Sequence, residues 1–207
     1  MLDISNQPSD RKAFFASIDL SPVAMIVTDP TLPDNPIRLA NSAFRTLTGY
    51  PNAEILGRNC RFLAGPTTDP AASAELRTAI DEKRPTLVQI VNYRRDGKLF
   101  LNGVTVIPLF DEDGNLRWFL GSQVDLGPPG NGGLTERKAR AARMIPSLTN
   151  RQREILALIA HGRTSKHIAR DLQISPRTIE VHRAHILFSL GVRSSAEAIR
   201  LAIEAGL

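Results

Sequence analysis

The sequence of 207 residues predicts an α+β domain with a five-stranded antiparallel sheet and covering helices, followed by an all-α domain of four helices. Strand signals and short helical segments mix up to about residue 126, helix-start signals dominate afterwards, and a Gly/Pro-rich segment separates the two parts. We therefore expect an N-terminal extension over residues 1–16, the α+β domain over 17–126, a linker with a connecting helix over 127–146, and the helical domain over 147–207.

Strand signals in the first part end in an antiparallel meander. A short apolar run at 24–28 opens the first of two early strands. Later, residues 86–93 and 99–110 flank Asp96-Gly97, a dipeptide typical of tight hairpins, and a second turn leads into a strand at 117–124. Helical pieces are expected in between, at residues 42–48, around Cys60 and at 71–83. This order favours a sheet with one face covered by helices.

The second part begins after a segment that can continue neither a strand nor a helix. Residues 127–133 hold two prolines, which lack an N–H donor, and four glycines, which lose much entropy on ordering. A charged helix is expected over 134–145. Thr149 with Gln152, and Ser194 with Glu197, fit capping boxes, and Ser175 precedes a proline at a first helical position.

Charge is distributed unevenly along the chain. Residues 1–126 carry 13 Lys and Arg against 15 Asp and Glu, whereas residues 127–207 carry 13 against 6 and all four histidines. A basic C-terminal third favours a polyanionic partner, although a solvated basic surface would have the same composition. The sequence shows no membrane-spanning stretch and no signal peptide, so we expect a cytoplasmic protein. With one cysteine, no internal disulfide is possible.

That cysteine lies in the run Gly57-Arg58-Asn59-Cys60-Arg61-Phe62-Leu63-Ala64-Gly65. By itself a lone cysteine is more often a small buried apolar residue than a reactive one. The run, however, resembles the signature of the LOV (light, oxygen or voltage) branch of the PAS domains at eight of nine positions, with Ala64 in place of the usual glutamine. The resemblance covers about residues 17–126 and includes further positions in order: 41–44, 48–50, 92–93, 102 and 121–123.

The LOV resemblance implies a non-covalently bound flavin, FMN, held across the sheet. Cys60 would be the photochemical nucleophile, bonding to the flavin C4a carbon under blue light and separating again in the dark. Because this is a reversible light-gated bond and not turnover, we expect that the chain is not an enzyme. Asn92 and Asn102 would hydrogen-bond the pyrimidine edge of the flavin, and Gln123 would face its N5 and O4 atoms.

The remaining contacts implied by the resemblance involve the ribityl chain and phosphate. Asn59 would contact the ribityl or ring region, and Arg61 and Arg77 would pair with the phosphate. Outside such a family, these side chains would be interpreted as ordinary capping or surface residues.

The C-terminal third has the pattern of a helix-turn-helix. Ile168 and Leu172 share one face of a short helix, residues 173–175 form a tight turn, and a second helix follows from Pro176 to about Ser189. The stretch resembles the LuxR/FixJ-type helix-turn-helix, which implies double-stranded DNA as partner and a homodimer as the active form. No Cys/His cluster indicates a metal site.

This second resemblance places the helix from Pro176 in the DNA major groove. Glu180 would accept from a cytosine amino group and Val181 would touch a thymine methyl, with Ala184 on the same outward face. Lys166, Arg177 and Arg183 are candidates for phosphate contacts, and Thr178, which is in register with the family pattern, is also expected to bind DNA.

Together the two resemblances imply a blue-light-regulated transcription regulator. The Cys60 adduct would rotate Gln123 and release the helix-turn-helix domain from the LOV sheet, so that it dimerises and binds DNA. The main alternative is a DNA-binding regulator with a redox or small-molecule PAS sensor. An enzyme using Cys60 as nucleophile would want a histidine base, and no histidine precedes His161.

Overall fold

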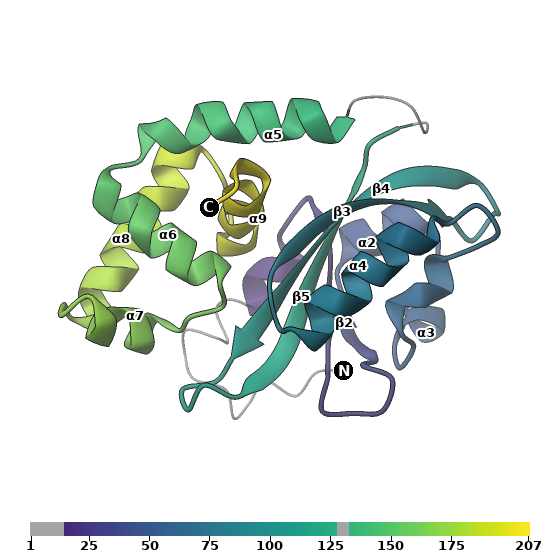
Figure 1. The fold of residues 1–207 in the computed structure, drawn as a ribbon, viewed down its shortest axis with the longest axis horizontal. Coiled ribbons are helices and arrows are strands. Elements are labelled where there is room, and N and C mark those ends of the chain that lie inside the picture. The colour runs from purple at the N-terminus through teal and green to yellow at the C-terminus, as the bar shows by residue number, and fades with distance from the viewer. Residues whose placement is uncertain (1–14, 128–132) are drawn as a thin grey trace.

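The computed structural model describes residues 15–127 and 133–207 (Figure 1). Most of the expected N-terminal extension and residues 128–132 of the expected linker lie outside the described residues. The described chain forms an α+β part with a central sheet and a helical C-terminal part, as the sequence predicts.

The sheet has five antiparallel strands in the order β2-β1-β5-β4-β3. The strands are β1 (Ala24–Thr28), β2 (Ile37–Ala40), β3 (Thr86–Tyr93), β4 (Leu99–Phe110) and β5 (Leu116–Asp125). The predicted Asp-Gly hairpin joins β3 to β4, with Gly97 at φ +81° in the left-handed region that glycine adopts at little cost. Because the sequential strands β3, β4 and β5 are neighbours, the predicted meander is confirmed.

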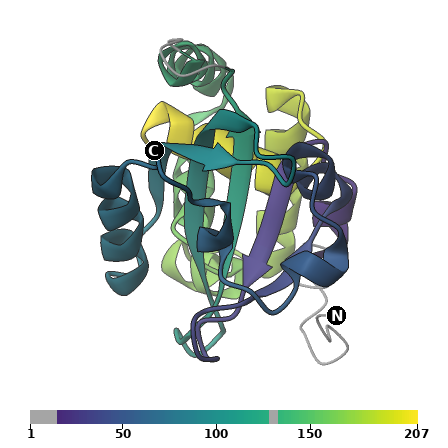
Figure 2. The same ribbon diagram turned by 90° about the vertical axis from the view of Figure 1, so that its right-hand side faces the viewer.

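Helices cover one face of the sheet (Figure 2). They are α2 (Ser42–Thr48), α3 (Asn52–Ile55), the 3₁₀ turn η1 (Cys60–Leu63) and α4 (Pro70–Asp81). Asn41 caps α2 by accepting from the Phe44 N–H at 2.9 Å, and its buried amide donates to the carbonyls of Ile18 and Val23. This cap fixes α2 to the entry of β1.

The helical part packs against the other face of the sheet (Figure 1). It comprises α5 (Gly133–Met144), the 3₁₀ turn η2 (Ile145–Ser147), α6 (Asn150–Ala160), α7 (Ser165–Asp171), α8 (Pro176–Leu190) and α9 (Ser195–Ala205). None of the described helices is long and apolar enough to cross a membrane.

Two of the three predicted helix starts form as expected, and the third differs. Thr149 and Gln152 make a complete capping box, and Ser175 caps α8 ahead of Pro176. Ser194 accepts from the Glu197 N–H at 3.2 Å, but the Glu197 carboxylate accepts from the hydroxyls of Ser194 and Ser21. The reciprocal bond of a capping box is therefore replaced by a link between α9 and the start of the α+β part.

One buried apolar cluster joins the two parts. Met25, Ile107 and Leu120 of the sheet lie in the same cluster as Leu156 of α6 and Ile199 of α9. The sequence left open whether the apolar face of α9 serves a dimer or the sheet. In the structure α9 lies between the sheet and α6 and α8, and most of its residues are buried (Figure 1).

Candidate functional sites

A cavity of about 670 Å³ lies between the sheet and the helices η1 and α4. This volume is in the range of small-molecule and cofactor pockets. Every position that the LOV resemblance assigned to the flavin lines it: Asn59, Cys60, Arg61, Arg77, Asn92, Asn102 and Gln123. The structure thus brings together residues from η1, α4 and three strands that are up to 64 positions apart in the chain.

Cys60 opens η1 at the edge of this cavity. The preceding Asn59 caps the turn by accepting from the Arg61 N–H at 3.0 Å, and donates to the Asp34 carbonyl at 2.7 Å. Cys60 packs against the apolar cluster under α2 and α3 and is half-buried. Burial raises the pKa of its thiol from 9.0 to about 12, so the sulfur keeps its proton at neutral pH.

Three amide side chains lie side by side on β3, β4 and β5. The Asn102 amide donates to the Asn92 side-chain oxygen at 2.9 Å and its own oxygen accepts from the Val124 N–H at 3.2 Å. Gln123 is 2% exposed, and its Oε1 has no hydrogen-bond partner among the described residues. A buried acceptor without a partner is costly, so this row of amides is suited to a ligand edge that carries both donors and acceptors.

Gly121 allows the side chains of Ile26 and Gln123 to pack closely against β5. A Cβ there would lie 2.9 Å from Ile26 Cγ1 and 3.2 Å from Gln123 Nε2. The other residues of β3, β4 and β5 that line the cavity are apolar and lie at alternate positions, as expected for one face of a sheet: Ile90, Val104, Val106 and Phe119.

Asp34 and Asn35 are among the cavity residues that were missed from the sequence. Asp34 and Asn35 adopt consecutive positive φ angles, +67° and +47°, in the loop between β1 and β2. The Asp34 carboxylate pairs with Arg61 at 2.5 Å, and the Asn35 Oδ1 is buried without a partner among the described residues. The available signal was the turn sequence Pro33-Asp34-Asn35-Pro36, since Asp and Asn tolerate the left-handed conformation.

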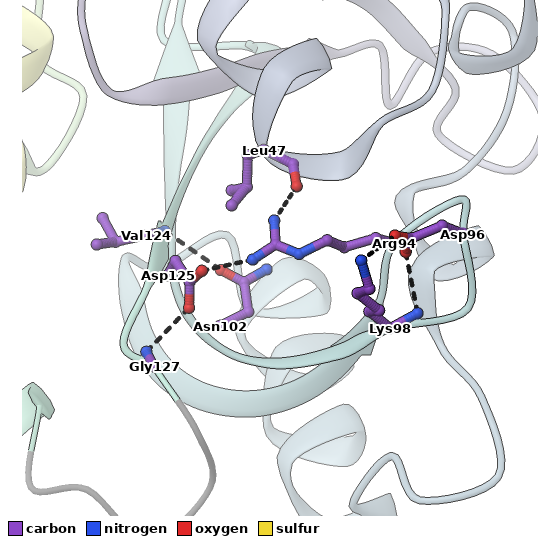
Figure 3. A network of polar contacts seen from close by, with 8 residues as sticks. All are labelled: Leu47, Arg94, Asp96, Lys98, Asn102, Val124, Asp125 and Gly127. Carbon is purple, nitrogen blue, oxygen red and sulfur yellow. Dashed lines mark hydrogen bonds and ion pairs between the residues drawn. The ribbon is translucent and has the colours of Figure 1, made fainter.

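The end of β5 is held by an arginine from the β3–β4 hairpin (Figure 3). The Arg94 guanidinium pairs with Asp125 and donates to the Leu47 carbonyl of α2. Asp125 lies opposite Asn102 in the sheet and also accepts from the Gly127 N–H at 2.9 Å. The strand that carries Gln123 is therefore fixed at the point where the chain leaves the sheet.

The second candidate site is the outer face of α8. Arg177, Glu180, Val181 and Ala184 are exposed together, while Ile179, Ile186 and Leu190 are buried. Thr178 is half-buried, and its hydroxyl shares a 2.8 Å hydrogen bond with the cap residue Ser175.

Two of the predicted phosphate-contacting residues are engaged within the protein. The Arg183 side chain is 17% exposed and donates to the hydroxyls of Ser165 and Ser195 at 3.0 and 3.2 Å. Its position between helices differs from the expected surface contact, because the two hydroxyls hold the guanidinium against α7 and α9. Lys166 pairs with Glu112 of the α+β part at 2.7 Å. Among the described residues, no group of three or more His, Cys, Asp or Glu could hold a metal ion.

Comparison with known families identifies both parts of the chain. Residues 22–127 match the model of the PAS domain, and residues 146–202 match the model of the bacterial regulatory proteins of the luxR family.

Similar solved structures are LOV domains. The LOV domain of a blue-light-activated histidine kinase of Erythrobacter litoralis shares 41% identity, with a TM-score of 0.51, over 52% of this chain and 99% of that chain. The light-state LOV domain of the photoreceptor Aureochrome1 shares 41% identity, with a TM-score of 0.53, over 59% of this chain and 96% of that chain.

Curated relatives are named blue-light-activated histidine kinases. The protein of Rhizobium johnstonii is 41% identical over 152 residues, which are 73% of this chain and 44% of the relative. A protein of Erythrobacter litoralis is 45% identical over 115 residues, which are 56% of this chain and 32% of the relative. The chain thus spans less than half the length of these relatives.

These names correct one expectation. We expected from the LOV resemblance that the chain is not an enzyme, and this inference is wrong, because relatives that share the LOV resemblance are named histidine kinases, which are enzymes. In this chain residues 146–202 match the luxR family.

Proposed function

Because the chain belongs to the PAS domain family and joins a LOV domain to a luxR-type helix-turn-helix, we propose that it regulates transcription in response to blue light. The single observation that carries the proposal is the cavity in which Cys60 and the six other predicted contact residues meet. We propose residues 17–126 as the sensor domain, 147–207 as the DNA-binding domain, and the cytoplasm as their location.

The cavity fits a flavin. Gln123 Oε1 and Asn35 Oδ1 are buried acceptors without described partners, and the amides of Asn92 and Asn102 line the same cavity. Apolar residues of the sheet would contact the faces of a flat ring. Arg61 and the exposed Arg77 line the same cavity and would pair with a phosphate, which favours FMN as the flavin.

A bound flavin would supply the light-absorbing ring and the carbon atom to which the Cys60 sulfur bonds reversibly under blue light. Cys60 holds its proton on Sγ in the dark, because burial raises the pKa of the thiol to about 12. The thiol therefore brings both the sulfur and the proton to the reaction. Asn59 orients Cys60 through the cap of η1.

Rotation of the Gln123 amide is the proposed first mechanical step. Its unpartnered Oε1 leaves its amide able to rotate when the group facing it changes from acceptor to donor. Gln123 lies on β5, and the other face of that strand contributes Leu120 to the cluster shared with α9. A shift of β5 would loosen this interface and free the helix-turn-helix to dimerise and bind double-stranded DNA.

The DNA-binding residues are proposed from exposure and helical position. Arg177, Glu180, Val181 and Ala184 form the accessible face of α8. Arg177 and Lys166 would contact phosphates, and Thr178 would support the first turn of the helix. Arg183 would need to leave Ser165 and Ser195 before it could reach a phosphate.

Absorbance of the purified chain supplied with FMN tests the sensor. We expect a yellow protein whose blue absorption bleaches under blue light and returns in the dark, whereas Cys60→Ala should bind FMN without bleaching. A chain that binds FMN but never bleaches would favour the alternative redox or small-molecule sensor. A colourless chain would refute the flavin proposal.

A further inference from the structure

The turn between β4 and β5 carries three consecutive acidic residues, Asp111, Glu112 and Asp113, here called the acidic turn. It extends from the end of the sheet toward the helical part. Lys166 of α7 reaches it with an Nζ–Oε2 distance of 2.7 Å to Glu112. The hydrogen bond to Glu112, then its charge and the charge of Asp113, raise the pKa of Lys166.

A second contact places α7 at this end of the sheet. Gly162, in the turn between α6 and α7, lies directly over β4, so that a Cβ there would be 2.1 Å from the Pro108 carbonyl oxygen and 3.1 Å from Phe110 Cδ2. Backbone packs on backbone at this point, four residues before Lys166. Backbone packing therefore helps to position the ion pair between Lys166 and Glu112, because it holds the start of α7 next to the acidic turn.

We propose that the acidic turn is an interaction surface that takes the place of a DNA phosphate on Lys166, so that the sensor domain and DNA compete for the same cation. The inference rests on the proposed function and specifies how DNA binding is regulated. The first helix of a helix-turn-helix crosses the DNA backbone, where a lysine meets phosphate oxygens. A carboxylate oxygen at hydrogen-bond distance offers Nζ the same charge and acceptor.

This surface is separate from the apolar face of α9. The α9 interface holds the two parts together by burial, whereas the acidic turn acts on one charge at the DNA-binding surface. Lys166 and Glu112 remain 69% and 43% exposed, so the pair is a modest contribution that salt weakens. Release of the helical part from the sheet would leave Lys166 able to contact a DNA phosphate.

Dark and light dissociation constants for a mixed-sequence DNA duplex test the proposal, with the flavin-loaded full chain at fixed salt. A mixed sequence is suitable because phosphate contacts do not depend on base sequence. Glu112→Gln should tighten binding about two- to fivefold in the dark, which is the range of an exposed ion pair, and leave the light value unchanged. In a Lys166→Gln background the same substitution should have no effect.

Glu54→Gln is the matched control. Glu54 is 40% exposed and pairs with Arg95 at 2.9 Å within the sensor part, so its loss removes the same charge from a similar ion pair. It should leave both dissociation constants at the wild-type values. Equal tightening by Glu54→Gln would show that only net charge matters and would overturn the proposal.

The outcomes separate this inference from the function on which it rests. If wild-type binding depends on light but Glu112→Gln binds as wild type in the dark, the acidic turn has no such role and the proposed function stands. If the wild-type chain binds no DNA in either state, the proposed function fails and this inference fails with it.

Discussion

At the scale of single residues, side chains of the cavity lack the solvent or the hydrogen-bond partners that they would have at the surface. Cys60 is kept neutral by burial, and Gln123 Oε1 is left without a described hydrogen-bond partner. Gly121 lets the side chains of Ile26 and Gln123 pack where a Cβ would collide with them. The unpartnered buried oxygen of Gln123 costs stability when nothing binds, which is the pattern expected of a site shaped for a ligand.

The raised pKa of Cys60 predicts a thiol that resists alkylation. The folded chain favours the neutral thiol, so the stability from Cys60 is complete below pH 9.0 and is lost as pH rises toward 12. In the flavin-free chain the rate of modification by iodoacetamide should stay low through pH 9.0 and rise only near 12. Because the chain has one cysteine, the rate reports on it directly. A rate that follows the ordinary pKa in the native chain would contradict this account.

Gly121→Ala should weaken flavin binding. The added Cβ would lie 2.9 Å from Ile26 and press on the Gln123 amide, and overpacking of this kind costs about 1–3 kcal/mol. Fluorescence titration with FMN measures the loss. Gly103→Ala is the control. Its Cβ would lie 3.2 Å from Leu126 Cδ1, and neither residue lines the cavity. Equal FMN affinities for both variants would show that Gly121 does not shape the pocket.

At the scale of helices and strands, local chemistry was predictable and long-range contacts were not. The capping box of Thr149 and the hairpin at Gly97 follow from neighbouring residues, and the structure has both. The pairing of Lys166 with Glu112 and the inward position of Arg183 depend on how distant elements pack, which spacing cannot reveal. Residues that line the cavity could be named from the sequence because the resemblance assigns positions that are remote in the chain to one ligand.

A side chain at Gly162 should disturb the packing of the helical part on β4 more than it disturbs the turn between α6 and α7. Gly162→Ala and Gly191→Ala both put a side chain at positive φ, +78° and +62°, and each should cost about 1 kcal/mol. Only at Gly162 would the Cβ also strike another segment, Pro108, whereas nothing lies near it at Gly191. Hydrogen exchange in the dark should therefore accelerate along β4 in the Gly162 variant alone. Similar exchange in the two variants would argue against a tight contact there.

At the scale of the whole molecule, one apolar cluster serves both parts of the chain. Residues of the sheet and of α9 are buried by each other, so the helical part cannot expose α9 without uncovering the sheet. The residues of the cavity and of this cluster alternate along the same strands and therefore lie on opposite faces of the sheet. A conformational change of Gln123 would therefore occur directly across β5 from the apolar interface that holds the helical part.

The central claim is that bond formation at Cys60 releases the DNA-binding part. Gel-shift titration of DNA selected from random sequence, in the dark and under blue light, tests it most directly. The wild-type chain should bind more tightly in the light, and Cys60→Ala, with FMN bound, should show the same weak binding in both conditions. A Cys60→Ala chain that still gains DNA affinity under blue light would contradict the account.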